Sequence, residues 1–109
     1  MITWSDFEKL DIRTGTIIDV HDFPEARNPA WKLTIDFGPL GIKRSSAQIT
    51  KLYGKEDLLG KQVIAVVNFP PKQIGPFISE CLVMGVLGDD KEVVLLQPER
   101  QVENGSRIG

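Results

Sequence analysis

The sequence has very few of the residues that build metal sites and disulfides. Among 109 residues there is one cysteine, Cys81, and one histidine, His21. One cysteine cannot form an internal disulfide, and these two residues cannot supply the four ligands of a structural zinc site. We therefore expect no metal or other cofactor, and the single cysteine indicates a reducing, cytoplasmic location.

Motifs of nucleophilic catalysis and of nucleotide binding are also missing. No G-x-S-x-G pattern surrounds the adjacent Ser45 and Ser46, and the chain has neither a Walker-type glycine-lysine loop nor a G-x-G-x-x-G turn. Catalytic triads are defined by geometry, so the distance of His21 along the chain does not by itself exclude one. With no glycine elbow around the serines, an enzyme is nevertheless the least favoured class, and we expect no catalytic residue.

Long apolar runs are absent as well. The longest, VIAVV and CLVMGVL, have the length of a β-strand rather than the ~20 residues that cross a bilayer. The first ten residues lack a basic stretch followed by an apolar one, so we expect neither a secretory signal nor membrane insertion. A composition of 41% hydrophobic and 26% charged residues is typical of one soluble domain, residues 1–109.

The net charge of −2 argues against a general polyanion binder, but the charges are unevenly distributed. Residues 1–36 carry four basic and seven acidic side chains, residues 43–72 six basic and two acidic, and residues 73–109 three basic and six acidic. A basic middle between acidic flanks predicts a local positive patch. The alternative is that strands from the three segments interleave and mix their charges.

The first half of the chain predicts a short helix and three strands. Ser5 and Glu8 have capping-box spacing, which predicts a helix over residues 5–10 within an N-terminal helical extension, residues 1–10. Apolar residues alternate over residues 11–20, where Gly15 predicts a bulge or a tight bend. Alternation over WKLTIDF, and again from Ile42 to Gln48 after the turn GPLG, predicts a hairpin.

The second half predicts a helix and three further strands. The segment ITKLYGKEDLLG has weak helical character that ends at Gly60, and the near-continuous apolar run KQVIAVVNF predicts a strand that is buried on both faces or central. We interpret KQIGPF as a loop, and SECLVMGVL and EVVLLQP as strands joined by the turn GDDK. Three strands, a helix and two strands is the order of the OB-fold. We predict an all-β, five-stranded Greek-key OB barrel with short helices and a C-terminal extension; an SH3-like barrel is the alternative.

Two polar clusters of the sequence are expected to meet on one face of this barrel. Alternation places Lys43 and Ser45 on one side of the third strand and Arg44, Ser46 and Gln48 on the other, so one serine faces outward. Lys72 precedes the fifth strand and Ser79-Glu80 opens it, and in an OB barrel that loop borders strands two and three. Hydroxyls and amides beside cations are the groups that hydrogen-bond phosphates, sugars and base edges. The structural alternative is a solvated strand face without a ligand.

Aromatic residues make up only 7% of the chain, which disfavours extensive base stacking. Trp31, Phe37 and Phe69 are expected in the core by their pattern. Recognition of a folded RNA by its shape and backbone suits such a sequence better.

Three stretches cover nearly the whole chain: DIRTGTIIDVHDFPEARNPAWKLTIDFG, SSAQITKLYGKEDLLGKQVIAVVNFPPKQIGPFISECLVMG and VVLLQPERQVENGSRIG. They resemble the tRNA-binding-domain family, and within it a branch of small chaperone-like proteins of protein secretion. The same domain is an extension of bacterial methionyl-tRNA synthetases and a part of the phenylalanyl-tRNA synthetase beta chain. The resemblance implies an OB-fold homodimer that binds tRNA, with a proposed chaperone role.

The resemblance also assigns expected roles to individual residues. Ser79 matches the family's tRNA-contacting serine at the opening of strand five, and Asn68 matches a polar residue after strand four. Leu82 stands where the family often has a methionine. The SSAQ stretch matches the secretion branch, whereas synthetase-type domains have a serine-glycine pair there.

Two functions follow, and they differ in the surface that each would use. The first is tRNA binding by a cytoplasmic homodimer, with contacts from Lys43, Arg44, Ser45, Ser46, Gln48, Lys51, Asn68, Lys72, Ser79 and Glu80. The second is a chaperone that binds unfolded or presecretory polypeptides and has no physiological tRNA role. Its candidate dimer or peptide contacts are Trp4, Phe7, Phe77 and Ile78.

Overall fold

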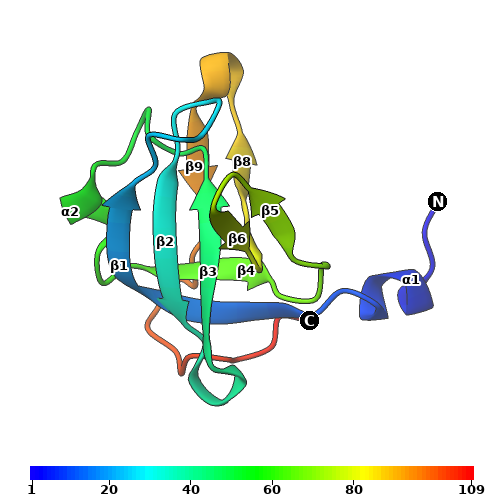
Figure 1. Cartoon of the computed structure of the whole chain (residues 1–109). Coiled ribbons are helices and arrows are strands. Elements are labelled where there is room, and N and C mark those ends of the chain that lie inside the picture. The colour runs from blue at the N-terminus through cyan, green and yellow to red at the C-terminus, as the bar shows by residue number, and fades with distance from the viewer.

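Five antiparallel strands form the body of the protein and wrap into a nearly closed barrel (Figure 1). The computed structural model describes residues 1–109, and the order of the strands in the sheet is β3-β2-β1-β4-β7. Their bounds are Ile12–Asp22 for β1, Trp31–Asp36 for β2, Ile42–Ala47 for β3, Gln62–Val66 for β4 and Leu82–Val83 for β7. The predicted β2–β3 hairpin is confirmed, with Leu33 paired to Ser45. The predicted barrel class is therefore confirmed.

Two hairpins and four short helical turns complete the fold. The hairpins are β5, Lys72–Ile74, with β6, Phe77–Ser79, and β8, Gly85–Leu87, with β9, Val93–Leu95. The helices are α1, Trp4–Glu8, and α2, Lys55–Leu58, and the 3-10 turns are η1, Gly38–Leu40, and η2, Asp89–Lys91. None of these helices has the length and apolar character needed to cross a membrane.

The segment between β4 and β9 differs from the prediction. The expected loop KQIGPF is most of the β5–β6 hairpin, which turns at Gly75 with a φ of +57°. The expected single strand over SECLVMGVL is divided into β7 and β8, and β8 leaves the barrel to pair with β9. Gly85 permits that pairing, because a Cβ there would lie 2.5 Å from Cγ1 of Val93. Single-sequence alternation did not reveal either break, since strands of two or three residues carry almost no periodic signal.

Helix α1 begins earlier than predicted. Its N-cap is Thr3, whose Oγ accepts a hydrogen bond from the Asp6 amide at 3.2 Å, while Asp6 accepts one from the Thr3 amide at 3.0 Å. Thr3 and Asp6 have the same three-residue spacing as Ser5 and Glu8. The prediction used the second pair, whereas the capping box is formed by the first pair. The hydrogen bonds from Thr3 lower the pKa of the Asp6 carboxyl below its ordinary value.

The long strand β1 contributes to both halves of the barrel. It pairs with β2 and β4, and its ladder with β2 is irregular between Ile17 and Asp19, so the bulge lies beyond Gly15. Gly15 instead allows the side chains of Ile35 and Phe37 to pack against the backbone of β1. A Cβ at this position would lie 2.7 Å from the Ile35 side chain and 2.8 Å from the Phe37 ring. The core enclosed by the strands consists of Ile17, Val20, Leu33, Ile35, Phe37, Ala47, Ile49, Leu58, Val63, Ala65, Cys81 and Leu95.

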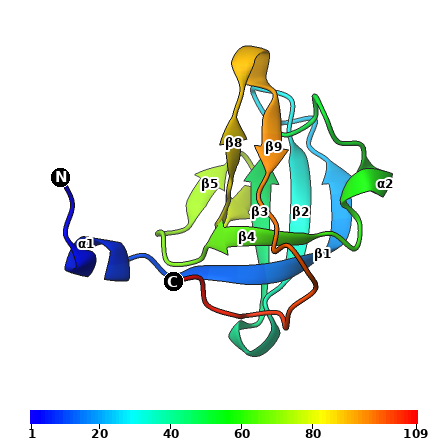
Figure 2. The same cartoon turned by 180° about the vertical axis from the view of Figure 1, so that it is seen from behind.

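The C-terminal extension runs back along the start of β1 (Figure 2). The Ile108 amide donates to the Ile12 carbonyl and the Gly105 amide to the Thr14 carbonyl, both at 2.8 Å. Asn104 and Gly105 form a turn within this segment. Helix α1 lies at the same end of the barrel and projects away from it, as both views show.

Candidate nucleic-acid interface

The two adjacent serines of β3 point to opposite sides of the sheet. Ser45 is buried, with 1% of its surface exposed, and its hydroxyl donates to the Cys81 carbonyl at 3.0 Å. Ser46 lies on the outer face with Arg44 and is half-buried. The structure therefore removes Ser45 from the candidate contacts, because a ligand cannot reach it, and leaves Ser46.

The β5–β6 hairpin is joined to β3 by a small set of hydrogen bonds. The Glu80 amide donates to the Arg44 carbonyl at 2.8 Å, and the Arg44 amide donates to Oε1 of Glu80 at 3.0 Å. The Ser46 amide donates to Oγ of Ser79 at 3.2 Å. The expected meeting of the strand-three cluster with Ser79 and Glu80 on one surface is confirmed.

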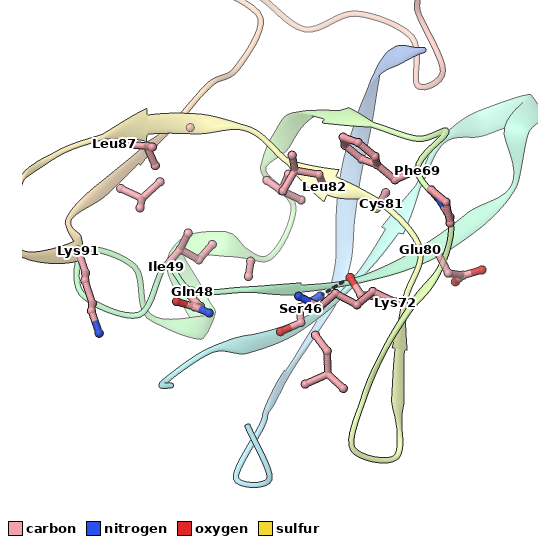
Figure 3. Close-up of a pocket in the computed structure, with 17 residues that line it drawn as sticks. Ser46, Gln48, Ile49, Phe69, Lys72, Glu80, Cys81, Leu82, Leu87 and Lys91 are labelled. Atoms are coloured by element: carbon pink, nitrogen blue, oxygen red, sulfur yellow. Dashed lines mark hydrogen bonds between the residues drawn. The ribbon is translucent and has the colours of Figure 1, made fainter. Parts of the chain in front are cut away.

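A cleft of about 740 Å³ lies where these elements meet (Figure 3). Five of the predicted contact residues line it: Ser46, Gln48, Lys72, Ser79 and Glu80. The rest of its wall is largely apolar and includes Ile49, Cys81, Val83 and Val93. Such a mixture of apolar surface with a few polar groups is typical of ligand sites.

Three exposed apolar residues of this cleft were missed or misplaced by the sequence analysis. Phe69 was expected in the core, but 49% of it is exposed, and Leu82 and Leu87 are 51% and 86% exposed. In the view of Figure 3, Phe69 and Leu82 lie opposite Ser46 and Gln48. Phe69 follows the end of β4 at Val66, so the alternation that suggested burial no longer applies to it. The Pro70-Pro71 pair directly after it is the sequence signal that the strand has already ended.

The basic middle of the chain forms only a partial positive patch. Lys51 pairs with Asp90 at 3.4 Å and Lys55 with Asp22 at 3.0 Å, so acidic residues of both flanking segments neutralise part of it. Lys43, Arg44 and Lys72 form no ion pair. Lys43 pairs across the ladder with buried Ile35, so its side chain leaves the sheet on the side opposite to Arg44. Part of the basic segment therefore mixes its charges with the acidic flanks, while Arg44 and Lys72 remain as a local positive patch.

Asn68 has a structural role in holding the N-terminal segment. Its Oδ1 accepts from the Asp11 amide at 2.9 Å, and its Nδ2 donates to the Lys9 carbonyl at 2.7 Å. It does not line the cleft, and neither do Lys43, Arg44, Ser45 and Lys51. Arg44 adjoins the cleft through its bonds to Glu80, whereas Lys51 lines a smaller polar hollow beside Asp90.

The four candidate apolar contacts do not form one surface. Trp4 is 84% exposed and Phe7 is half-buried on the projecting helix α1. Ile78 is 50% exposed on β6, but Phe77 beside it is only 2% exposed. The expectation that Phe77 is exposed is therefore wrong: its ring packs 5.3 Å from the ring of Phe23.

The catalytic and metal-binding candidates do not come together. Nε2 of His21 lies 2.8 Å from Oδ2 of Asp19 near the exposed end of β1, while the Ser45 hydroxyl is used by the Cys81 carbonyl. Burial raises the pKa of the Cys81 thiol to about 11, which disfavours the reactive thiolate. No group of three or more histidine, cysteine, aspartate or glutamate side chains is arranged to hold a metal ion.

Solved structures and curated proteins similar to this chain include two CsaA chaperones and a methionine–tRNA ligase. Chaperone CsaA of Bacillus anthracis str. Ames has 53% identity and a TM-score of 0.96, over 100% of this chain and 99% of that chain. CsaA of Picrophilus torridus has 55% identity and a TM-score of 0.94, over 100% of both chains. Methionine–tRNA ligase of Nanoarchaeum equitans is 38% identical over 110 residues, which is 99% of this chain but 14% of the ligase.

The family comparison covers the whole barrel. The model described as "Putative tRNA binding domain" matches residues 12–107, from the first residue of β1 to the C-terminal segment that lies against it. The curated ligases that match are much longer, and the chain spans about one seventh of their length. The match thus concerns the one domain that these proteins share with this chain, and the chain belongs to the tRNA-binding-domain family.

Proposed function

We propose that this protein binds tRNA with the surface formed by the outer face of β3, the β5–β6 hairpin and the cleft between them. The observation that carries the proposal is the convergence of Ser46, Gln48, Lys72 and Ser79 on one cleft in a member of this family. Hydroxyls, an amide and an unpaired cation are suited to phosphate and 2′-hydroxyl contacts. The proposal includes no reaction, because the ligase relatives share only 14% of their length with this chain.

The salt dependence of tRNA affinity tests this proposal directly. If several phosphates are neutralised, log K falls linearly with log salt, by about 0.9 per phosphate contact. We expect Lys72→Ala to lower that slope by about 0.9, and Ser46→Ala to lower affinity at an unchanged slope. An affinity that stays flat from low to moderate salt contradicts tRNA binding of this kind.

A second candidate function is binding of unfolded polypeptide, as in a chaperone of protein secretion. It is favoured by the exposed apolar wall of the cleft, Phe69, Leu82 and Leu87, and by the similarity to structures named CsaA chaperone. Ile78 on the neighbouring hairpin extends this apolar surface. Phe69→Ser should then weaken suppression of client aggregation more than it weakens tRNA binding. A wild-type protein that neither slows aggregation nor binds presecretory peptides contradicts this function.

We also propose that the protein acts as a homodimer in the cytoplasm. Helix α1 has five residues and no buried side chain, and an isolated helix of that length is not stable in water. Trp4 and Ile2 are 84% and 76% exposed, which is typical of a surface that a second copy covers. Two copies place two nucleic-acid surfaces on one particle. The proposed cytoplasmic location is supported by tRNA as the proposed partner and by the single free thiol.

A further inference from the structure

We propose that Lys32 and Arg44, held over the packed rings of Phe23 and Phe77, form a phosphate-binding strip for a nucleic-acid backbone beside the cleft. The proposal rests on the proposed nucleic-acid function and deepens it. It assigns a binding role to Lys32, which lies outside the candidate contacts, and positioning roles to two buried aromatic residues.

The two rings form a small apolar cluster separate from the barrel core. Phe23 follows β1 and Phe77 lies in β6; they are 5% and 2% exposed, with ring centroids 5.3 Å apart at an interplanar angle of 55°. Ala30 is buried with them, and Ile74 packs against the cluster. The cluster ties the β5–β6 hairpin to the segment after β1, so the rings have a fixed position relative to the sheet.

Each ring makes a cation–π contact with one basic side chain. The guanidinium carbon of Arg44 lies 4.3 Å from the centroid of Phe77, and Nζ of Lys32 lies 5.5 Å from the centroid of Phe23. Cation–π contacts of this kind hold a long side chain in place without neutralising its charge. Neither cation forms an ion pair, whereas Lys55, which lies 5.7 Å over the Trp31 ring, also pairs with Asp22. The charges of Lys32 and Arg44 therefore remain available to an anion.

The strand register brings the two cations and two hydroxyls together. Lys32 is paired with Ser46 and Arg44 with Thr34 across the β2–β3 ladder. All four point outward, because Leu33 and Ser45 between them are buried. Diagonal neighbours on one face of a sheet lie about 7–8 Å apart, within reach of long side chains. Ser46 also lines the cleft, so this strip of Lys32, Thr34, Arg44 and Ser46 continues the proposed interface.

The chemistry of the strip favours phosphodiester oxygens. A guanidinium that lies over a ring still presents its N–H edge, which matches two phosphate oxygens, and the neighbouring hydroxyls can donate to the same group. The rings fix both cations before binding, which reduces the conformational entropy lost on association. The competing explanation is that the two side chains only shield the rings from water.

The experiment is a salt series of binding with tRNA and with polyuridylic acid as probes. Lys32→Ala and Arg44→Ala each remove one phosphate contact. Each is therefore expected to lower the slope of log K against log salt by about 0.9 with the helical arms of tRNA and by about 0.7 with single-stranded polyuridylic acid. Arg44→Lys and Phe77→Leu keep the charge at position 44 but lose the contact between the guanidinium and the ring. They are therefore expected to keep the slope and to weaken binding several-fold. Lys61→Ala is the matched control, because Lys61 lies 5.9 Å over the Tyr53 ring and donates to Gln97.

The outcomes separate this inference from the proposed function. If tRNA binds with a wild-type slope in both Lys32→Ala and Arg44→Ala, the strip is wrong while tRNA binding stands. If polyuridylic acid binds through the strip and tRNA does not bind, the strip stands and the proposed tRNA function is wrong. A wild-type protein that binds neither probe overturns both. Because Phe77 is buried, its variant is interpreted only with an unchanged melting temperature, and Arg44→Lys gives the same test at an exposed position.

Discussion

The adjacent Ser45 and Ser46 have different roles because they lie on opposite faces of β3. We expect the buried Ser45 to contribute to stability and the outward Ser46 to contribute to binding. Replacing Ser45 by alanine leaves the buried Cys81 carbonyl without its hydroxyl donor, which should lower the free energy of unfolding by about 1–3 kcal/mol. Replacing the outward Ser46 by alanine should leave stability within about 0.5 kcal/mol and weaken tRNA binding instead. Urea unfolding and tRNA titration of both variants measure the contrast. Equal stabilities for the two variants contradict the assignment of inner and outer faces.

The burial of Cys81 leads to a prediction about its reactivity. Its pKa is raised from 9.0 to about 11, chiefly by burial, so at pH 8 the thiolate should be about 100-fold rarer in the folded protein than in the unfolded chain. Alkylation by iodoacetamide should be slower in the native state by at least that factor, with the same protein in urea as the control. Since the folded pKa exceeds the unfolded one, the neutral thiol stabilises the fold below pH 9.0. That stabilisation is lost as the pH rises toward about 11. Equal native and unfolded alkylation rates contradict this.

At single positions, alternation predicted pairs of faces correctly but could not identify which face is buried. It placed Ser45 and Ser46 on opposite sides, and the barrel's closure then decided which serine is inside. It misjudged Phe69, which lies just past the end of β4, and it gave no signal for Phe77, which was assigned to a loop. Burial at both positions depends on contacts distant in the sequence. Lys32 was missed for the same reason, since its value as a candidate comes from the ring of Phe23.

Among the elements, the long strands were predictable and the short ones were not. Strands β1 to β4 have five or more residues, with alternation in β1 to β3 and a continuous apolar run in β4, whereas β5 to β9 have two or three residues each. The cleft depends on those short strands, because the β5–β6 hairpin provides Lys72 and Ser79. The sequence therefore predicted several residues that line the cleft, but it did not predict the β5–β6 hairpin on which Lys72 and Ser79 lie.

The connection between the N-terminal helix and the barrel gives a prediction at the scale of elements. Asn68 bonds both the Asp11 amide and the Lys9 carbonyl, so Asn68→Ala should release the segment that carries α1. We expect the Asp11 amide to exchange with solvent much faster, while the amides of β2 and β4 keep their protection. Asn28→Ala, in the loop between β1 and β2, is the matched control. Loss of protection throughout the barrel contradicts a role limited to this segment.

At the scale of the whole molecule, the proposed homodimer depends on the same N-terminal segment. Helix α1 has no buried side chain, and Trp4 is 84% exposed. The segment is joined to the barrel by hydrogen bonds of Asn68 and Arg107 and not by apolar packing of the helix. A second copy that covers α1 supplies such packing, because it buries the indole and the neighbouring Ile2. The proposed homodimer thus explains why the N-terminal segment exposes two large apolar side chains, Trp4 and Ile2.

Replacing Trp4 by serine should shift the protein from dimer to monomer without unfolding the barrel, because Trp4 belongs to neither core cluster. Sedimentation velocity over a range of protein concentrations measures the shift, and Leu87→Ser, on the exposed β8–β9 hairpin, is the control for general surface hydrophobicity. The monomer should also bind tRNA more weakly than the dimer, since two linked surfaces raise the effective concentration of the second contact. A wild-type protein that sediments as a monomer at all concentrations contradicts the dimer. A Trp4→Ser protein that remains dimeric instead places the interface on another part of the barrel.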